Sequence, residues 1–133
     1  MVDNLAGATR SKVMASIKGR DTVPEMMVRR LLWAQGTRYR VHDTHIPGRP
    51  DISNSRSKVA VFIDGCFWHG CRKCYKEPTS NIEFWRNKLR QNIQRRRAVR
   101  RKLRTGGWRV LEFWEHEVLS DPSSVVRKIR RAI

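Results

Sequence analysis

The chain has 133 residues, of which 29 are basic and 12 acidic, giving a formal net charge of +17 at pH 7. Its apolar content of 39% is enough to fill one hydrophobic core, so we expect a single domain over residues 1–133. So large a charge exceeds what solubility requires and indicates a polyanionic partner. Arginine supplies 21 of the basic residues, and its planar guanidinium suits phosphate oxygens and guanine edges, which favours nucleic acid over an acidic membrane.

The opening residues MVDNLAGATR form neither an apolar leader nor a basic amphipathic or lipidated segment. The longest apolar run is far shorter than the roughly 20 residues that a membrane span needs. We therefore expect a cytoplasmic protein of bacterial type that avoids membranes and associates with the chromosome.

The first half of the chain predicts two helices followed by extended segments. Thr9–Ile17 reads as a short helix, and Thr22–Gln35 as a second one, in which Thr22 and Glu25 have the spacing of a capping box. Residues 39–42 form a strand candidate. The Pro47-Gly48-Arg49-Pro50 turn then leads into Asp51-Ile52, and residues 59–63 predict a buried strand.

The second half adds a cysteine-rich loop, two helices and one more strand. Residues 81–104 predict a long helix that ends at Gly106-Gly107. A strand over 108–114 and a last helix over 122–132 complete the pattern. The expected fold class is α/β, with a small mixed central sheet flanked by helices.

Three cysteines, Cys66, Cys71 and Cys74, lie within nine residues of each other in a chain without an export signal. Such spacing favours a structural Zn²⁺ site over disulfides. The fourth ligand is either His69, inside the loop, or His116, far along the chain. We choose His116, because it would tie the loop to the end of the last strand.

Carboxylates are few enough to consider one by one as magnesium ligands. Asp51 follows a rigid turn at the head of a strand, and Asp64 ends the next strand, so the two would share one end of the sheet. Carboxylate oxygens are what Mg²⁺ needs to assist phosphodiester cleavage. Glu25 is a third candidate. Two simpler interpretations stay open: Asp51 as a turn-capping residue, and Glu25 as a helix-capping residue only.

Several motifs together resemble the very short patch repair (Vsr) mismatch endonucleases. The resemblance covers roughly residues 8–119 and rests on Ala8-Thr9-Arg10-Ser11-Lys12 with Met14, Arg20-Asp21-Thr22 with Glu25, Pro47-Gly48-Arg49-Pro50-Asp51, Gly65-Cys66-Phe67-Trp68-His69, Phe84-Trp85 with Lys88 and Asn92, Gly107-Trp108-Arg109-Val110 and Trp114-Glu115. It implies a restriction-endonuclease-like core, a structural zinc, and Mg²⁺-dependent nicking of one strand beside a T·G mismatch in repair of deaminated 5-methylcytosine.

The resemblance also implies roles for individual residues. Asp51 matches the family's metal-binding aspartate, and the backbone carbonyl of Ile63 would supply a second oxygen to Mg²⁺. His69 matches the proposed general base, for which an imidazole that titrates near neutrality is suited. A zinc-loop role for His69 stays open.

Phe67 and Trp68 resemble the aromatic wedge that opens the base stack at the mismatch, with Met14 as an apolar partner. Inserting such side chains costs a few kcal/mol of unstacking, least where pairing is imperfect. From pattern alone, Phe67 and Trp68 would instead be core residues. We expect the other four tryptophans, Trp33, Trp85, Trp108 and Trp114, in the core.

On the long helix, a rotation of about 100° per residue places one apolar stripe over Trp85, Leu89, Val99 and Leu103. Asn92 and Arg96 fall inside this stripe, and Lys88 lies at its edge. Because polar groups on an apolar face need partners, we expect these three to face the active cleft and its DNA. The remaining basic residues of the helix should set affinity and salt dependence.

The sequence departs from the family pattern in the spacing of its third cysteine, at His116, where a cysteine is frequent, at Asp64, where a histidine also occurs, and at Arg96, where an acid is common. Asp64 could recruit a second Mg²⁺ or restrain His69. Two alternatives to the mismatch nuclease stay open: a restriction-type nuclease on the same core, and a non-catalytic zinc-containing DNA-binding module. As partners we expect mismatched double-stranded DNA and proteins of a repair pathway, with the chain itself a monomer.

Overall fold

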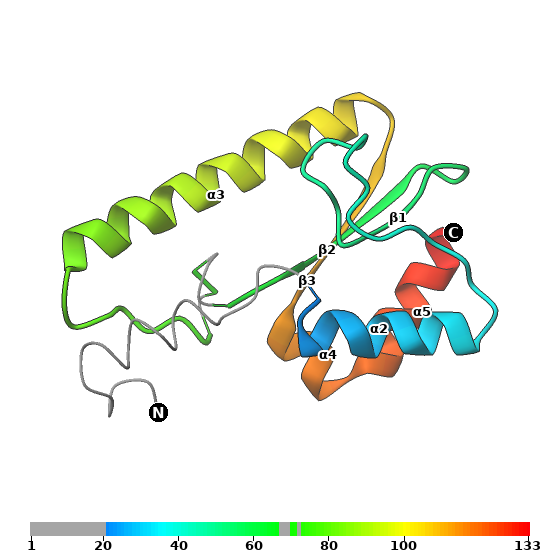
Figure 1. Ribbon diagram of the computed structural model, residues 1–133, viewed down its shortest axis with the longest axis horizontal. Coiled ribbons are helices and arrows are strands. Elements are labelled where there is room, and N and C mark those ends of the chain that lie inside the picture. Colours follow the sequence, from blue (N-terminus) through cyan, green and yellow to red (C-terminus); the bar gives the residue numbers. More distant parts are fainter. Residues whose placement is uncertain (1–20, 67–69, 72) are drawn as a thin grey trace.

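A computed structural model of the chain describes residues 21–66, 70–71 and 73–133. The elements of these ranges (Figure 1) are α2 (Val23–Ala34), β1 (Ile52–Asn54), β2 (Val59–Asp64), α3 (Ile82–Thr105), β3 (Arg109–Trp114), α4 (Glu115–Ser120) and α5 (Pro122–Ala132). The helix predicted over Thr9–Ile17 lies outside the described residues. None of the helices in the described ranges combines the length and apolar character that crossing a membrane requires.

The three strands form one mixed sheet in the order β1-β2-β3. β1 pairs with β2 antiparallel, with Ile52 opposite Val61, and β2 pairs with β3 parallel, with Val61 opposite Leu111. β2 is therefore the central strand, and all six of its residues are buried. The small mixed sheet flanked by helices confirms the predicted fold class.

Side chains alternate along β2 and divide the core between the two faces of the sheet. Val59, Val61 and Ile63 pack with residues of α2, α4 and α5, whereas Ala60 and Phe62 pack with Leu103 of α3. Figure 1 shows the same division, with α3 on one side of the strands and α2, α4 and α5 on the other. The end of β2 therefore lies between two different helical layers.

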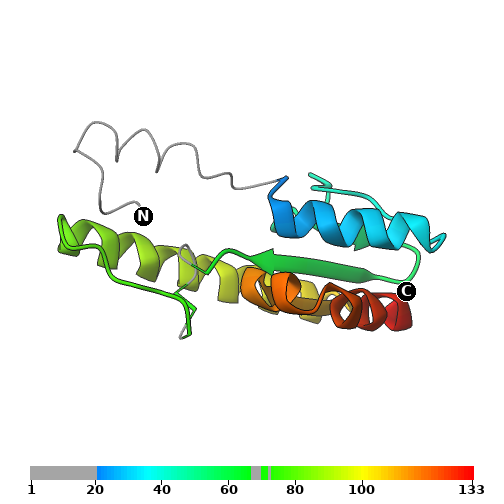
Figure 2. The same ribbon diagram turned by 90° about the horizontal axis from the view of Figure 1, so that it is seen from below.

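Helix α3 is only partly packed on the sheet. Its buried residues, Arg100 and Leu103, lie in its last two turns, and Val99 packs beside them. The first half of the helix extends beyond the strands in both views (Figures 1 and 2) and carries the exposed Phe84. The predicted apolar stripe is confirmed at Val99 and Leu103, while Trp85 is half-buried and packs edge-to-face on Phe84.

The strand predicted over residues 39–42 is wrong in extent. A single bridge joins Arg40 to Ser53, through backbone hydrogen bonds of 2.9 Å in both directions. His42 then takes a φ of +46°, a left-handed conformation that ends extended pairing. Helix α4 was not foreseen, because its six residues are too few to show a helical period.

The prediction of Trp33 as a core residue is also wrong, since 55% of it is exposed. The buried face of α2 carries Val28 and Leu32, and the next residue points about 100° away from that face. Trp33 instead packs edge-to-face on Tyr39, and the Arg38 guanidinium lies 3.7 Å from its ring centroid. Trp85, Trp108 and Trp114 are half-buried.

Candidate active site and metal centres

The turn before β1 fixes the position of Asp51. Gly48 has a φ of +79°, and a Cβ there would come 2.2 Å from Val99 Cγ1, so both the conformation and the packing require glycine. After the turn, Asp51 Oδ2 accepts a hydrogen bond of 2.6 Å from the Ile63 N–H. The carboxylate is thereby held at the end of β2, with 15% of its side chain exposed.

Glu25 approaches the same place from α2 and uses its two oxygens differently. Oε2 completes the predicted capping box, accepting from the Thr22 N–H at 2.7 Å and from the Thr22 hydroxyl at 3.0 Å. Oε1 is fully buried and has no hydrogen-bond partner among the described residues. The capping role is confirmed, and it uses only Oε2, so that Oε1 faces the site.

His42, which the sequence analysis did not single out, lies between these two carboxylates. Its Nε2 is 3.3 Å from Glu25 Oε1, and its Nδ1 is 3.9 Å from Asp51 Oδ1. Only 9% of the side chain is exposed. One ligand atom each from Glu25, His42 and Asp51 lie within 4.8 Å of one another. Neither a motif nor a periodic pattern pointed to His42, because a loop alone brings it here.

The electrostatics of this cluster suit a bound cation. Burial and the neighbouring Glu25 raise the pKa of the Asp51 carboxyl to about 9, although the hydrogen bond from Ile63 acts to lower it. Two carboxyl groups that share a buried space cannot both ionise without compensating positive charge. Arg29 Nη2 lies 3.7 Å from Glu25 Oε1 and supplies part of that charge, and because Oε1 accepts no hydrogen bond from the described residues, the donor set also fits a hard divalent cation such as Mg²⁺.

Asp64 reaches the same end of the sheet but points toward α3. Its Oδ1 accepts a hydrogen bond of 2.7 Å from Arg100 Nη2, and its Oδ2 is 3.6 Å from Arg96 Nε. In the buried Asp64–Arg100 pair, each side chain is at most 7% exposed. The structure therefore brings Glu25 together with Asp51, while Asp64 is engaged with arginines on the other face.

The three cysteines and His116 come together as a second cluster. Cys66, Cys71 and Cys74 place their Sγ atoms at 3.4, 3.5 and 3.4 Å from His116 Nδ1. Around one tetrahedral ion, Zn–S bonds of roughly 2.3 Å and a Zn–N bond of roughly 2.0 Å would place sulfur and nitrogen about 3.5 Å apart. The spacing of the four side chains therefore fits zinc.

The chemistry of the thiols points the same way. Burial, together with the neighbouring thiols Cys71 and Cys74, raises the pKa of Cys66 to about 12. A thiol so reluctant to ionise needs a cation if it is to act as a thiolate ligand. α4 supplies His116 as its second residue, directly after β3, so the cluster joins the loop to the end of the sheet.

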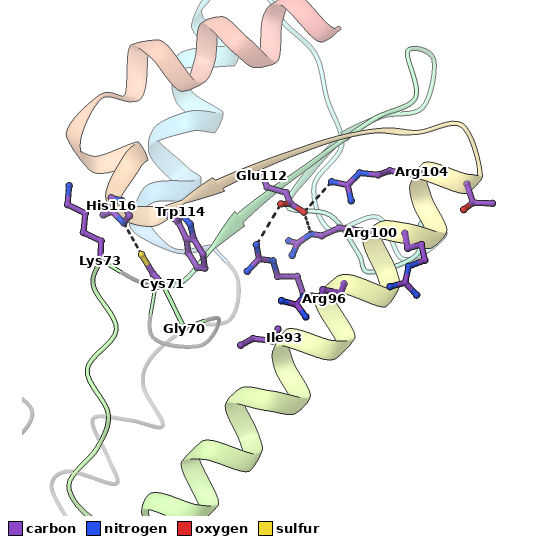
Figure 3. A pocket seen from close by; sticks show the side chains of 13 residues that line it. Gly70, Cys71, Lys73, Ile93, Arg96, Arg100, Arg104, Glu112, Trp114 and His116 are labelled. Carbon is purple, nitrogen blue, oxygen red and sulfur yellow. Dashed lines mark hydrogen bonds and ion pairs between the residues drawn. The ribbon is translucent and has the colours of Figure 1, made fainter.

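A basic cavity of about 870 Å³ lies between α3, β3 and the cysteine loop (Figure 3). Glu112 of β3 gathers arginines from three successive turns of α3, at 3.7 Å from Arg96, 3.2 Å from Arg100 and 3.5 Å from Arg104. The Arg96 guanidinium also lies 5.0 Å from the Trp114 ring centroid. One glutamate thus organises a cavity wall that keeps an excess of positive charge.

The remaining predicted DNA-binding residues divide into two groups. Lys88 and Asn92 are half-buried on the first half of α3, and Arg96 lines the basic cavity one turn further on. Met14, Phe67, Trp68 and the predicted base His69 lie outside the described residues.

Comparison with known proteins places the chain in a family. The family model of the DNA mismatch endonuclease Vsr matches residues 2–76. The DNA mismatch endonuclease Vsr of Escherichia coli K12 is 43% identical over 117 residues, covering 86% of this chain and 74% of that protein. The type II nicking enzymes V.NmeDIP of Neisseria meningitidis serogroup C and V.HpaIIP of Haemophilus parainfluenzae are 40% and 41% identical, each over 99% of this chain and over 90% and 96% of their own lengths. The chain belongs to the DNA mismatch endonuclease Vsr family and is a DNA endonuclease.

Proposed function

We propose that this protein is a Mg²⁺-dependent endonuclease that nicks one DNA strand beside a T·G mismatch, in the repair of deaminated 5-methylcytosine. The observation that carries the proposal is the buried pair Glu25 and Asp51 at the end of β2, in a protein with a net charge of +17. The names of the relatives, mismatch endonuclease and nicking enzyme, support it. These relatives are bacterial, which favours action on a bacterial chromosome in the cytoplasm.

Asp51 and the backbone carbonyl of Ile63 would hold the Mg²⁺ ion. A strand residue directs its N–H and C=O toward the same edge, so the Ile63 N–H that meets Asp51 places the carbonyl on that edge too. When bound, Mg²⁺ lowers the pKa of a coordinated water and neutralises charge on the phosphate. Asp51 would fix the ion, and Glu25 Oε1 would orient the attacking water.

We assign His69 as the general base, which takes the proton from that water. Asp64 acts in this scheme through its arginines, because its oxygens hold Arg96 and Arg100 toward the basic cavity. There the Arg96 guanidinium, the more exposed of the two, would receive a phosphate of the DNA backbone, while the buried Arg100 supports the wall behind it.

The DNA-contacting roles follow the same division. Phe67 and Trp68, with Met14, would open the stack at the mismatch, and Lys88, Asn92 and Arg96 would contact the duplex along α3. Zinc held by Cys66, Cys71, Cys74 and His116 would fix the loop that carries the wedge and His69.

Cleavage of matched and T·G-mismatched duplexes, labelled on each strand, tests the proposal with Mg²⁺ and without it. We expect one nick beside the mismatch that requires Mg²⁺, and its loss in Asp51→Ala protein that still binds DNA. Equal cutting of matched duplex would indicate the restriction-type nuclease. Binding without any cutting would indicate the DNA-binding module, and an active Asp51→Ala variant would overturn the assignment of the ion site.

A further inference from the structure

We propose that His42 is a positioning residue of the ion site, which orients Asp51 directly and Glu25 through Arg29 for the divalent ion. The inference rests on the proposed function, since it concerns the same site. Its basis is the place of one imidazole, with a ring nitrogen within 4 Å of a carboxylate oxygen on each side.

The backbone of His42 is fixed next to the turn that carries Asp51. Its N–H donates a hydrogen bond of 3.1 Å to the carbonyl of Pro50, the residue before Asp51. Its φ of +46° is a conformation that residues other than glycine adopt infrequently and at some energetic cost. This strained backbone turns the imidazole inward, where 9% of the side chain remains exposed.

Arg29 fixes the ring from α2. Its Nη2 lies 2.9 Å from His42 Nε2 and 3.7 Å from Glu25 Oε1, so one guanidinium spans both groups. Its other terminal nitrogen donates a hydrogen bond of 2.8 Å to Asp21 Oδ1. Since a guanidinium only donates, Nε2 is the acceptor, and the proton of the neutral ring is on Nδ1, toward Asp51.

The Ile63 N–H orients Asp51 by a hydrogen bond at Oδ2, and the imidazole adds an electrostatic contact on the other side, with Nδ1 3.9 Å from Oδ1. Groups that orient metal ligands in this way typically contribute a factor of roughly 10–100 to metal affinity. Loss of His42 should weaken divalent-ion binding by about that factor. The KM for DNA should stay unchanged, because only 9% of the His42 side chain is exposed to a bound duplex.

The experiment uses full-length, zinc-loaded protein and Mn²⁺ as the probe, with binding followed by electron paramagnetic resonance in the absence of DNA. Subtracting the binding that remains in Asp51→Asn protein isolates the site. His42→Leu fills the space without hydrogen bonding, whereas His42→Gln keeps one acceptor for Arg29 and one donor for Asp51. His45→Gln is the matched control, because His45 is in the same loop and 92% of its side chain is exposed.

We expect His42→Leu to weaken Mn²⁺ binding by roughly 10–100-fold. His42→Gln should recover part of that loss, and His45→Gln should match the parent. The Mg²⁺ concentration for half-maximal nicking should rise in parallel. Mn²⁺ affinity within twofold of the parent in folded His42→Leu protein overturns the inference.

If thermal melting shows that His42→Leu protein is unfolded, the Mn²⁺ affinities of His42→Gln and Arg29→Gln proteins test the inference instead. Unchanged Mn²⁺ affinity in both variants overturns the inference. Binding unaffected by Asp51→Asn overturns it as well. A parent protein that binds Mn²⁺ through Asp51 but nicks no duplex contradicts the proposed function alone.

Discussion

At Asp51, binding an ion and keeping the fold stable make opposite demands on one carboxyl group. Burial and Glu25 raise its pKa from an ordinary 3.8 to about 9, so without a divalent ion the folded protein holds a proton that the unfolded chain releases. Ionising the group at neutral pH therefore costs folding free energy, which a bound cation offsets. Asp51 therefore suits a bound ion, but it lowers the stability of the ion-free protein at neutral pH.

Asp51 should make the stability of Mg²⁺-free, zinc-loaded protein fall as pH rises. The folded pKa exceeds the unfolded one, so the contribution is complete below about 4 and lost progressively up to about 9. Asp51→Asn cannot titrate and should be the more stable protein near pH 8, by roughly 1–2 kcal/mol. Urea unfolding of both proteins across this range measures the difference, and parallel pH profiles would contradict it.

Glu25 allows its two roles to be separated by substitution. Glu25→Gln keeps an oxygen for the Thr22 N–H but removes the charge, so we expect a stability change below about 1 kcal/mol and a loss of nicking of roughly 100-fold or more. Thr22→Ala should show the reverse balance, with about 1 kcal/mol lost and a smaller effect on nicking. Nicking assays and thermal melts on both variants check this, and equal nicking in both would assign Glu25 to capping alone.

At the scale of the element, α3 serves the core with its last turns and the surface with the rest. Arg100 of this helix is buried beside the apolar core. Asp64 from β2 and Glu112 from β3 compensate its charge. The periodic pattern of the helix predicted which face meets the sheet. It could not predict Arg100, because its partners come from two strands that only the folded chain brings together.

Removing one partner of the Asp64–Arg100 pair should be costly. Asp64→Ala leaves a buried guanidinium with Glu112 alone, and we expect a loss of roughly 3–5 kcal/mol in unfolding free energy. The double variant Asp64→Leu with Arg100→Met should recover most of it, since no buried charge remains. Chemical denaturation of the single and double variants tests this, and additive losses would argue against a coupled pair.

The exposed arginines of α3 that line the basic cavity should set salt dependence without affecting the chemical step. Replacing Arg97 and Arg101 with Gln removes two cations from the proposed DNA-binding surface, so the slope of log affinity against log salt should become shallower by about 2. The rate of nicking at saturating protein should remain unchanged. Arg127→Gln with Arg131→Gln on α5, on the opposite side of the sheet, is the control with equal charge loss. Equal slopes for both double variants would show that charge alone matters.

For the whole molecule, the sequence predicted what depends on local pattern or on family motifs. The bounds of α2 and α5, the mixed sheet, the capping box and the Cys66, Cys71, Cys74 and His116 cluster all agree with prediction. His42 was missed because a loop alone brings it to the site, and the pairing of Asp64 with arginines was missed because it depends on which face of the sheet the side chain meets. Trp33 was wrong for a related reason, since hydrophobicity alone does not place a residue on the buried face of a helix.

The cysteine cluster joins parts of the fold that are far apart in sequence, so its loss should affect both stability and cleavage. The link from Cys66 to His116 spans 50 residues and ties the loop after β2 to the start of α4. Closing a segment of that length by a metal removes much conformational freedom from the unfolded chain. The proposed base and wedge lie between Cys66 and Cys71, so they depend on the same closure.

Replacing Cys71 and Cys74 together with Ser should therefore reduce zinc from about one ion per chain to nearly none and lower the unfolding free energy by several kcal/mol. Nicking should fall even where the variant remains folded, because the loop that presents His69 is no longer fixed. Elemental analysis of protein purified without chelator, melting curves and nicking at low temperature give the three measurements, with His45→Gln as the control. Full nicking by folded, zinc-free protein would show that the loop keeps its working arrangement without the metal.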